Sequence, residues 1–276
     1  MADESETRAV ERHYAARALE ESVLEALRAA GRDPEALTPA DVAVFDQFHV
    51  RGLTATRELA ELAGIGAADR VLDVGSGTGG PSRFLAATYG CRVRGLDLTP
   101  EYCRVATLLA RLTRLDERLD YTTGDALRLP FADHEFDVVW TQHAAMNIAD
   151  RRRLYGEMRR VLRPGGRLAV HDVVAGRGAL LHFPVPWARD PSISHLVTAA
   201  EMRELLAGAG FTPQSWRDDT EAARAWFAQS PRPGPTAAAP PLGLNVLMGP
   251  DFPKMVANLR RNLEEGRVTL VMAVLG

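Results

Sequence analysis

The sequence predicts an α/β fold with a mostly parallel, Rossmann-like sheet and helices on both of its faces. Between residues 70 and 174, short apolar runs alternate regularly with segments of helical periodicity, which is the pattern of βαβ units. The first apolar run ends at a glycine-rich turn that leads into a helical segment. In open parallel sheets, ligands bind beyond the carboxyl ends of the strands, so we expect the functional residues to gather there.

The composition is that of a globular protein. The chain has 276 residues, of which 46% are hydrophobic and 25% are charged, and its net charge is −3. This balance gives no electrostatic case for binding nucleic acid or a membrane surface. Residues 1–12 are charged, and no apolar run approaches the length of about eighteen residues that indicates a membrane helix. Cys91 and Cys103 form no metal motif and suggest a reducing compartment. We therefore expect a cytoplasmic protein without a metal site.

The elements are expected in the following order. Residues 8–30 have helical spacing, a short helix runs from the Thr38 cap to Phe45, and another helix covers Leu53–Ala63. Strands are expected near 70–74, 92–97, 119–123, 136–141 and 167–174, with helices near 80–89, 100–114 and 151–162. Residues 175–197 form an irregular insertion. The remaining elements are a helix (Ala199–Ala209), a strand (Phe211–Trp216), a helix (Thr220–Ala228), a connector (Ser230–Pro241), a helix (Phe252–Glu265) and a strand (Val268–Val274).

The turn after the first strand predicts a nucleoside-binding loop. Gly75, Gly77 and Gly79 can adopt positive φ angles and let a ligand approach the backbone. The alternative frame that ends at Gly80 fits the dinucleotide fingerprint, so the glycine spacing alone does not separate NAD from other nucleosides. Asp73 lies inside the apolar strand, where a carboxylate needs a cationic or hydrogen-bonding partner. The ammonium group of S-adenosylmethionine (SAM) would supply one.

Two further acids follow the next two strands. Asp97 comes twenty residues after Gly77, where a carboxylate can accept hydrogen bonds from both ribose hydroxyls. Asp125 follows the third strand, in a position to accept from an adenine amino group. An acid-lined pocket suits a cationic sulfonium, and the sequence has no triphosphate-binding loop.

These residues resemble the class I SAM-dependent methyltransferases. Asp73–Gly79 (D-V-G-S-G-T-G), Asp97, Gly124–Ala126 (G-D-A) and Leu162–Gly166 (L-R-P-G-G) match the motifs of that family in order and separation. The resemblance implies SAM as the cofactor and a seven-stranded sheet with one antiparallel edge strand. It divides residues 1–276, as a single domain, into an N-terminal helical cap (1–66), a SAM-binding core (67–174), a substrate-side insertion (175–197) and the C-terminal half of the sheet (198–276). The matching positions predicted to contact the cofactor are Asp73, Gly75, Ser76, Gly77, Asp97, Leu98, Asp125 and Ala126.

A closer resemblance is to bacterial glycine, sarcosine and dimethylglycine N-methyltransferases. It rests on residues 46–56 (D-Q-F-H-V-R-G-L-T-A-T), 130–137, 142–150 (Q-H-A-A-M-N-I-A-D), 183–188 and 240–244. In those enzymes N-terminal helices cap the SAM site. The resemblance therefore makes Gln47 and His49 candidates for cofactor contact and Tyr14 a candidate for substrate contact.

The ends of the fourth and fifth strands supply the catalytic candidates. Gln142 and His143 should lie beside the methyl-transfer site, with Gln142 touching the cofactor. Asp172 follows the pattern of acids that end strands, so we prefer it to His171 as a second catalytic candidate. Some related O-methyltransferases carry a histidine pair near this point, where this chain has Met146 and Asn147, which argues against copying their base.

The acceptor side is predicted less sharply. Asn147 and Trp187 are candidate substrate contacts, and Phe183 and Arg189 are further candidates for the wall of the insertion. A small amino acid would need an arginine for its carboxylate, and Arg51 is the substrate-binding candidate, beside Arg177 and Arg189.

Three functions remain open at this point. The first is methyl transfer from SAM to a small molecule, with an amine such as a methylated glycine as the leading acceptor. The second is O-methylation of a natural product, with His143 or Asp172 as the base. The third is a non-catalytic nucleotide-binding module or an NAD-dependent dehydrogenase. A small-molecule partner is expected in each case, and a homodimer is left open.

Overall fold

The structure, a computed structural model, describes residues 19–177, 180–229 and 242–276. Its centre is a seven-stranded sheet in the order β3-β2-β1-β4-β5-β7-β6. The strands are β1 (Arg70–Val74), β2 (Arg92–Asp97), β3 (Leu119–Thr123), β4 (Phe136–Gln142), β5 (Leu162–Ala175), β6 (Pro213–Asp218) and β7 (Val268–Leu275). The predicted α/β class and Rossmann-like sheet are thus confirmed. The fifth strand is longer than expected, because it begins at Leu162 and includes the L-R-P-G-G segment.

One detail of the sheet differs from the expectation. The antiparallel strand is β7, which pairs with β5 on one side and with β6 on the other, so it lies one place in from the edge. The burial patterns explain this arrangement. Seven of the eight residues of β7 are buried, whereas no residue of β6 is. The apolar strand therefore takes the inner position, and the more polar strand tolerates the exposed edge.

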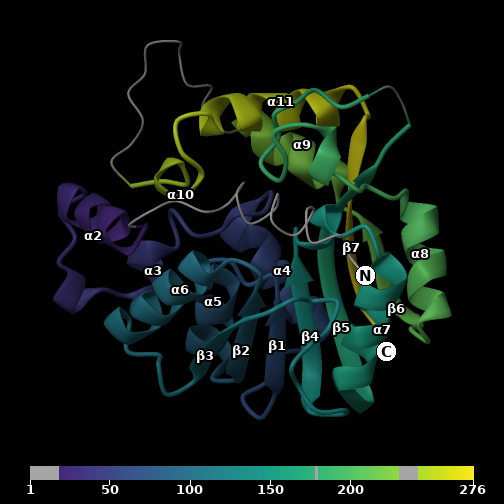
Figure 1. The fold of residues 1–276 in the computed structure, drawn as a ribbon, viewed down its shortest axis with the longest axis horizontal. Coiled ribbons are helices and arrows are strands. Elements are labelled where there is room, and N and C mark those ends of the chain that lie inside the picture. Colours follow the sequence, from purple (N-terminus) through teal and green to yellow (C-terminus); the bar gives the residue numbers. More distant parts are fainter. Residues whose placement is uncertain (1–18, 178–179, 230–241) are drawn as a thin grey trace.

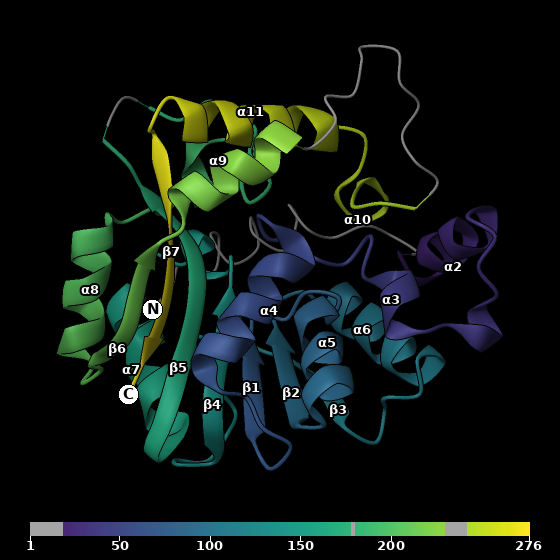
Figure 2. The ribbon, with the colours of Figure 1, turned by 180° about the vertical axis from the view of Figure 1, so that it is seen from behind.

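Helices cover both faces of the sheet (Figures 1 and 2). One face carries α4 (Gly52–Ala63) and α5 (Gly80–Tyr89), and the opposite face carries α7 (Arg151–Val161) and α8 (Ala199–Gly208). The helix α6 (Pro100–Leu112) packs beside β2 and β3, and α2 (Leu19–Ala29) packs on α6. The shorter elements are η1 (Pro34–Ala36), α3 (Pro39–Val42), η2 (Ala145–Asn147), η3 (Pro191–Ile193) and α10 (Asn245–Met248).

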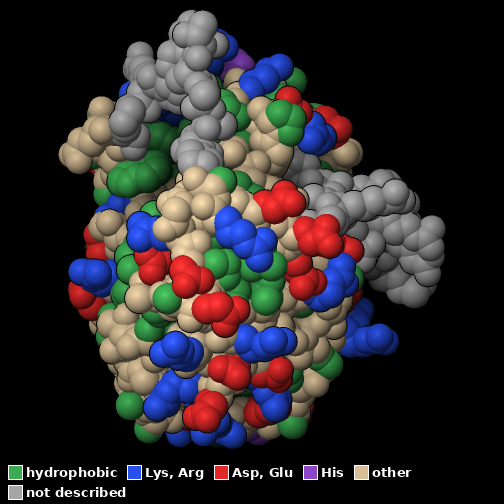
Figure 3. All heavy atoms as spheres, turned by 90° about the vertical axis from the view of Figure 1, so that its left-hand side faces the viewer, with side chains coloured by type: hydrophobic (Ala, Val, Ile, Leu, Met, Phe, Trp, Pro, Cys, Tyr) green, Lys and Arg blue, Asp and Glu red, His purple; other side chains and the backbone are tan. Residues whose placement is uncertain are grey.

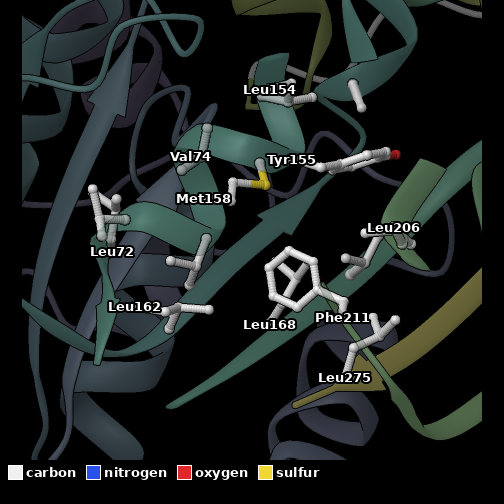
Figure 4. Close-up of a cluster of buried hydrophobic side chains, with 14 of the residues drawn as sticks. Leu72, Val74, Leu154, Tyr155, Met158, Leu162, Leu168, Leu206, Phe211 and Leu275 are labelled. Carbon is white, nitrogen blue, oxygen red and sulfur yellow. The ribbon is translucent and has the colours of Figure 1, made fainter. Parts of the chain in front are cut away.

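Alternation along the strands assigns side chains to the two faces. Leu72 and Leu168 belong to the core under α7 and α8, whereas their neighbours Val71 and Ala169 belong to the core under α4 and α5. Figure 4 shows the first of these cores, where Met158 of α7 meets strand side chains. A shift by one position along a strand therefore sends a side chain to the other face.

A third layer covers the carboxyl ends of the strands. It contains α9 (Thr220–Gln229) and α11 (Phe252–Glu264), which lie above the sheet in Figure 1. Val185 and Trp187 of the insertion share a buried apolar cluster with Phe227 of α9 and Leu259 of α11. The expected connector Ser230–Pro241 and the first part of the helix predicted over 8–30 lie outside the described residues.

The surface agrees with the mixed composition. Figure 3 shows basic and acidic side chains interspersed over one side of the molecule, without an extended basic patch on that side. Among the described residues, no helix has both the length and the apolar character required to span a membrane.

Two leucines of α4 test the packing of that helix on the sheet. Leu59 is fully buried, whereas the side chain of Leu62 is 42% exposed. Leu59→Ala should lower the free energy of unfolding by about 2–5 kcal/mol, because it leaves a cavity in the core. Leu62→Ala, in the same helix, should lower it by less than about 1 kcal/mol. Urea unfolding of both variants checks this, and equal losses would contradict the described packing.

Candidate active site

A single cavity of about 520 Å³ opens at the carboxyl ends of β1, β2 and β4. The polarity of its lining differs between the elements that contribute to it. The turns after β1, β2 and β3 contribute glycine, serine and aspartate, whereas α9, α11 and the insertion contribute apolar and aromatic side chains. The volume is within the range of ligand sites, about 300–1,000 Å³.

The glycine turn after β1 is built by a close approach of backbones. Gly75 has φ 78°, and a Cβ added there would lie 2.3 Å from the Cβ of Ala144, just after β4. Gly77 and Gly79 also have positive φ angles, as predicted. Gly80 does not, and an added Cβ would lie 2.3 Å from the backbone oxygen of Asp46. The fourth glycine is therefore needed for packing against the N-terminal segment.

Asp97 is fixed in the cavity lining by backbone donors. Its Oδ2 accepts from the N–H of Gly77 at 2.8 Å, and its Oδ1 accepts from the N–H of Thr99 at 2.9 Å. Burial raises the pKa of Asp97, and these two hydrogen bonds oppose the rise. Each carboxylate oxygen keeps a second lone pair, so the group can still accept hydrogen bonds from a ligand.

The neighbouring candidates also reach the cavity. Ser76 lies in its lining, and its buried Oγ has no hydrogen-bond partner among the described residues. Asp125 uses Oδ1 to accept from the N–H of Leu127 at 2.8 Å. Leu98 and Ala126 also line the cavity.

Asp73 does not occupy the predicted position. Its carboxylate lies outside the lining formed by the described residues and accepts from Ser82 Oγ at 2.6 Å. Burial raises its pKa to about 7, with the Ser82 hydrogen bond opposing and the nearby Asp97 adding to the rise. The structure therefore gives Asp73 a role in joining β1 to α5. Its neighbour Val74 lines the cavity, and successive side chains of a strand point to opposite faces of the sheet.

The N-terminal segment of residues 46–52 is packed against the site. Asp46 lines the cavity and forms an ion pair with Arg83 of α5, and both side chains are 1% exposed. His49 lines the cavity, with Nε2 2.9 Å from the carbonyl oxygen of Gly52. Gln47 lies outside the lining and accepts from Thr56 Oγ1 at 3.1 Å. Sequence reasoning missed Asp46, because nothing local indicates its distant partner Arg83.

The predicted arginines do not reach the cavity. Arg51 pairs with Asp219 at 2.7 Å and with Glu58. Arg189, whose side chain is 55% exposed, pairs with Asp251, and Arg177 is exposed. The described part of the lining contains no lysine or arginine. The proposed carboxylate contact of Arg51 is therefore wrong in this structure, because a buried aspartate from β6–α9 already occupies its guanidinium.

The end of β4 carries Gln142 and His143 into the cavity lining. Gln142 Oε1 accepts from Trp140 Nε1 at 3.1 Å, and its buried Nε2 has no partner among the described residues. The backbone of His143 has φ 50°, in the left-handed region that is uncommon for residues other than glycine. Its imidazole belongs to a residue of the cavity lining.

Asn147 and Trp187 also line the cavity, and they are connected. Asn147 Nδ2 donates to the carbonyl oxygens of Trp187 at 2.7 Å and Ile193 at 2.8 Å. The amide thus holds the insertion against the end of β4, and Trp187 forms part of the cavity wall. Phe183 packs in the apolar cluster behind that wall. Tyr14 lies outside the described residues.

Neither Asp172 nor His171 lines the described part of the cavity, and the two side chains have different partners. Asp172 faces α7, where it lies 3.5 Å from Arg151 and outside the described lining, so it cannot touch a ligand there. Burial raises its pKa to about 6, despite Arg151. His171, the preceding residue on β5, faces α4 and lies 3.1 Å from Asp219. The two side chains point to opposite faces because they are successive residues of one strand.

Three imidazoles gather beneath the cavity. The ring centroid of His143 lies 5.0 Å from that of His171 and 6.1 Å from that of His49. Burial lowers the pKa of all three, that of His49 to about 3, so they are neutral near pH 7. Among the described residues, no group of histidine, cysteine or carboxylate side chains is arranged to hold a metal ion.

Comparison with known proteins defines the class. Residues 72–170 match the methyltransferase domain family, and this stretch contains the glycine turn, Asp97, Asp125 and His143. Residues 72–170 thus carry a methyltransferase domain, and the fold is that of the class I methyltransferases, which use SAM as cofactor.

Particular relatives share parts of the chain. Methyltransferase GfsG of Streptomyces halstedii is 38% identical over 51% of this chain and 50% of its own length. The 27-O-demethylrifamycin SV methyltransferase of Amycolatopsis mediterranei is 31% identical over 61% and 63%. The glycine/sarcosine/dimethylglycine N-methyltransferase of Actinopolyspora halophila is 38% identical over 40% and 20%. The chain thus spans about half, or less, of the length of several curated relatives, and the predicted N-methyltransferase branch is one of several that it resembles.

Solved structures resemble the chain over nearly its full length. The cyclase SpnF superposes with a TM-score of 0.66 and 25% identity, over 93% of this chain and 92% of that one. A geranyl diphosphate C-methyltransferase from Streptomyces coelicolor A3(2), in complex with S-adenosyl-L-homocysteine, has a TM-score of 0.69 and 19% identity, over 99% and 98%. The latter likeness establishes the fold.

A substitution at Gly75 tests the close approach at the turn. Gly75→Ala should lower the free energy of unfolding by about 2–4 kcal/mol, because the residue has φ 78° and the new Cβ meets Ala144. Gly156→Ala, in α7 with nothing within 4 Å of the added Cβ, should be neutral or stabilising by up to about 1 kcal/mol. Chemical unfolding of both proteins is the measurement, and a tolerated Gly75→Ala would contradict the described turn.

The raised pKa of Asp73 predicts a pH-dependent stability. The native carboxyl keeps its proton up to about pH 7, whereas the unfolded one releases it near 3.8, so native stability falls as the pH rises through this window. Asp73→Asn cannot ionise and escapes this loss. The free energy of unfolding of Asp73→Asn minus that of the wild type should be about 2–3 kcal/mol higher near pH 8 than near pH 5. Urea unfolding of ligand-free protein measures it, and the same difference at both pH values would refute the shift.

Proposed function

We propose that this protein transfers a methyl group from SAM to a hydroxyl group of a largely apolar small molecule. One observation carries the proposal: a single cavity has Asp97 and the glycine turn in one part of its lining, and His143 beneath an apolar wall in another. The first part suits the cofactor, and the second suits an acceptor that must lose a proton.

The residues present fit SAM. The lone pairs left on Asp97 suit two ribose hydroxyls, and Asp125 can accept from an adenine amino group. The unpartnered Ser76 Oγ and Gln142 Nε2 are buried polar atoms that a polar ligand would satisfy. Leu98 and Leu127 offer apolar contacts to the adenine plane. When bound, SAM supplies an electrophilic methyl carbon on a positively charged sulfur.

The chain itself supplies alignment, shielding and a base. Holding two reactants in line can lower a barrier by about 7–11 kcal/mol, so positioning is the main contribution. Trp187, Phe227 and Leu259 exclude water from the acceptor side. The imidazole of His143 is neutral near pH 7, because burial lowers its pKa, and it can accept the proton of an acceptor hydroxyl.

The lining favours a neutral, apolar acceptor over a methylated glycine. The carboxylate of an amino acid needs a cationic partner, and the described lining offers none. Trp226, Phe252 and Val256 extend the apolar wall instead. The resemblance to an O-methyltransferase over 61% of the chain supports a hydroxyl acceptor. An amine remains the second candidate, because a neutral amine requires no base.

A third possibility comes from the cyclase SpnF, which is 25% identical to this chain over most of its length. A related fold can thus serve chemistry other than methyl transfer. Consumption of SAM distinguishes the two, since methyl transfer converts it stoichiometrically to S-adenosylhomocysteine.

Calorimetric titration tests the cofactor site. The wild type should bind SAM and not NADH, and Asp97→Ala should weaken SAM binding by about tenfold to a hundredfold, because it removes charge-assisted acceptors for the ribose. Asp120→Ala is the matched control, since that carboxylate lies in the neighbouring strand with its side chain 68% exposed. Folded protein without SAM affinity would overturn the cofactor assignment.

Product analysis tests the acceptor. Hydroxylated aromatic and polyketide-type compounds should yield O-methyl products, and sarcosine and dimethylglycine should yield none. His143→Ala should lower turnover of a hydroxyl acceptor by about 10²–10⁴-fold, the usual contribution of a positioned base. Methylated sarcosine formed at equal rates by the wild type and His143→Ala would instead establish the amine, and bound SAM that is never consumed would favour the third possibility.

A further inference from the structure

The proposed role of His143 as a base does not explain two buried nitrogen atoms, one in its own ring and one in the ring of His171. Nε2 of His143 and Nδ1 of His171 are both buried and have no hydrogen-bond partner among the described residues. Buried polar nitrogens without partners are rare in folded proteins. The two rings are neighbours, with centroids 5.0 Å apart and planes inclined by 44°, and their unpartnered nitrogens do not form a hydrogen bond with each other in this structure.

The far side of His171 is fixed by a carboxylate. Its Nε2 lies 3.1 Å from Oδ2 of Asp219, in the turn between β6 and α9. Burial favours a raised pKa for Asp219, but hydrogen bonds from His171 and Arg51 outweigh it and hold the pKa below its ordinary value. Asp219 is therefore ionised near pH 7 and accepts a hydrogen bond from Nε2–H of His171. In a neutral ring this leaves Nδ1 of His171 as an acceptor.

Two arginines and two carboxylates form a network next to His171, so their charges cancel, and the network extends to the protein surface. Asp219 also accepts from Arg51 and from Arg217, and Glu58 pairs with both arginines. The side chain of Arg217 is 42% exposed, so the far end of the network meets solvent. The other titratable group facing His171 is His49 on the N-terminal segment, whose ring centroid is 6.2 Å away. His49 is neutral near pH 7, and its Nε2 lies 2.9 Å from the carbonyl oxygen of Gly52.

We propose that His171 and Asp219 are positioning residues that select the tautomer of His143. This inference deepens the proposed function and rests on it. Asp219 holds the proton on Nε2 of His171. A small rotation of the two neighbouring rings then lets the free Nδ1 of His171 accept from Nε2–H of His143, and Nδ1 of His143 is left unprotonated for the acceptor. The backbone supports the alignment, since the N–H of His143 donates to the carbonyl oxygen of His171 at 2.9 Å.

The chemistry of this arrangement balances. The acceptor oxygen forms a bond to the methyl carbon while the carbon–sulfur bond breaks and its electron pair stays on sulfur. The acceptor proton moves to Nδ1 of His143, and the Nε2 proton of His143 can pass to Nδ1 of His171. The positive charge then rests on an imidazolium beside the carboxylate of Asp219, where the charges attract.

Histidine tautomers in the ligand-free protein test the inference directly. In full-length protein with ¹⁵N-labelled histidine near pH 7.5, two-bond ¹⁵N–¹H correlations should show His143 and His171 both protonated at Nε2. Asp219→Asn should change the tautomer of His171 and, through it, of His143. Asp172→Asn is the matched control, because it makes the same change in a buried, arginine-paired aspartate on the opposite face, and it should change neither tautomer. A proton on Nδ1 of His143 in the wild type, or unchanged tautomers in Asp219→Asn, would overturn the inference.

Kinetics provide the second readout. With an acceptor that the wild type methylates, Asp219→Asn should lower kcat by about tenfold to a hundredfold and leave the acceptor KM and SAM affinity within about twofold. The acid limb of the pH–rate profile should move to lower pH, because removal of the carboxylate charge disfavours the imidazolium. Equal losses of kcat and stability in Asp219→Asn and Asp172→Asn, with no change of profile, would mean a merely structural role. Absence of SAM binding or methylated product would instead refute the proposed function, while the tautomer result would stand.

Discussion

The close approach of two backbones at Gly75 and Ala144 is the constraint on which the site depends. Because no side chain separates the turn after β1 from the end of β4, the cofactor-side acids and His143 face one common space. The carboxylates of Asp97, at the end of β2, and Asp125, just after β3, and the imidazole just after β4 could not otherwise line one cavity of about 520 Å³. The left-handed backbone of His143 belongs to the same constraint, since the chain must reverse immediately after β4.

Buried ion pairs connect the parts of the chain around this core. Arg83 and Asp46 join α5 to the N-terminal segment, and Arg51 and Asp219 join that segment to the C-terminal half of the sheet. Isolated buried charges are strongly unfavourable, and removal of one partner leaves the other uncompensated. These pairs therefore contribute less to net stability than to a defined placement of the segment that walls the cavity.

The features that were predicted correctly from the sequence are those determined by residues close together in the chain. The bounds of the first three strands and the glycine turn follow from patterns within a few residues, and the structure has them where they were expected. The errors concern orientation and distant partners. Asp172 and His171 differ by one position on β5, and that single step decides which one faces the cavity side of the sheet. Arg51 is held by Asp219, a residue so far along the chain that no local pattern could reveal the pairing.

The acceptor wall has two parts that differ in how they are anchored. Asn147 ties the insertion, and with it Trp187, to the loop that carries His143. Trp226, Phe252 and Val256 belong to the helices of the upper layer. Exchanges of side chains on those helices can therefore reshape the space offered to the acceptor without displacing the base. A scaffold with this division can acquire new substrates in evolution, or in the laboratory, while the geometry of the reaction is inherited unchanged.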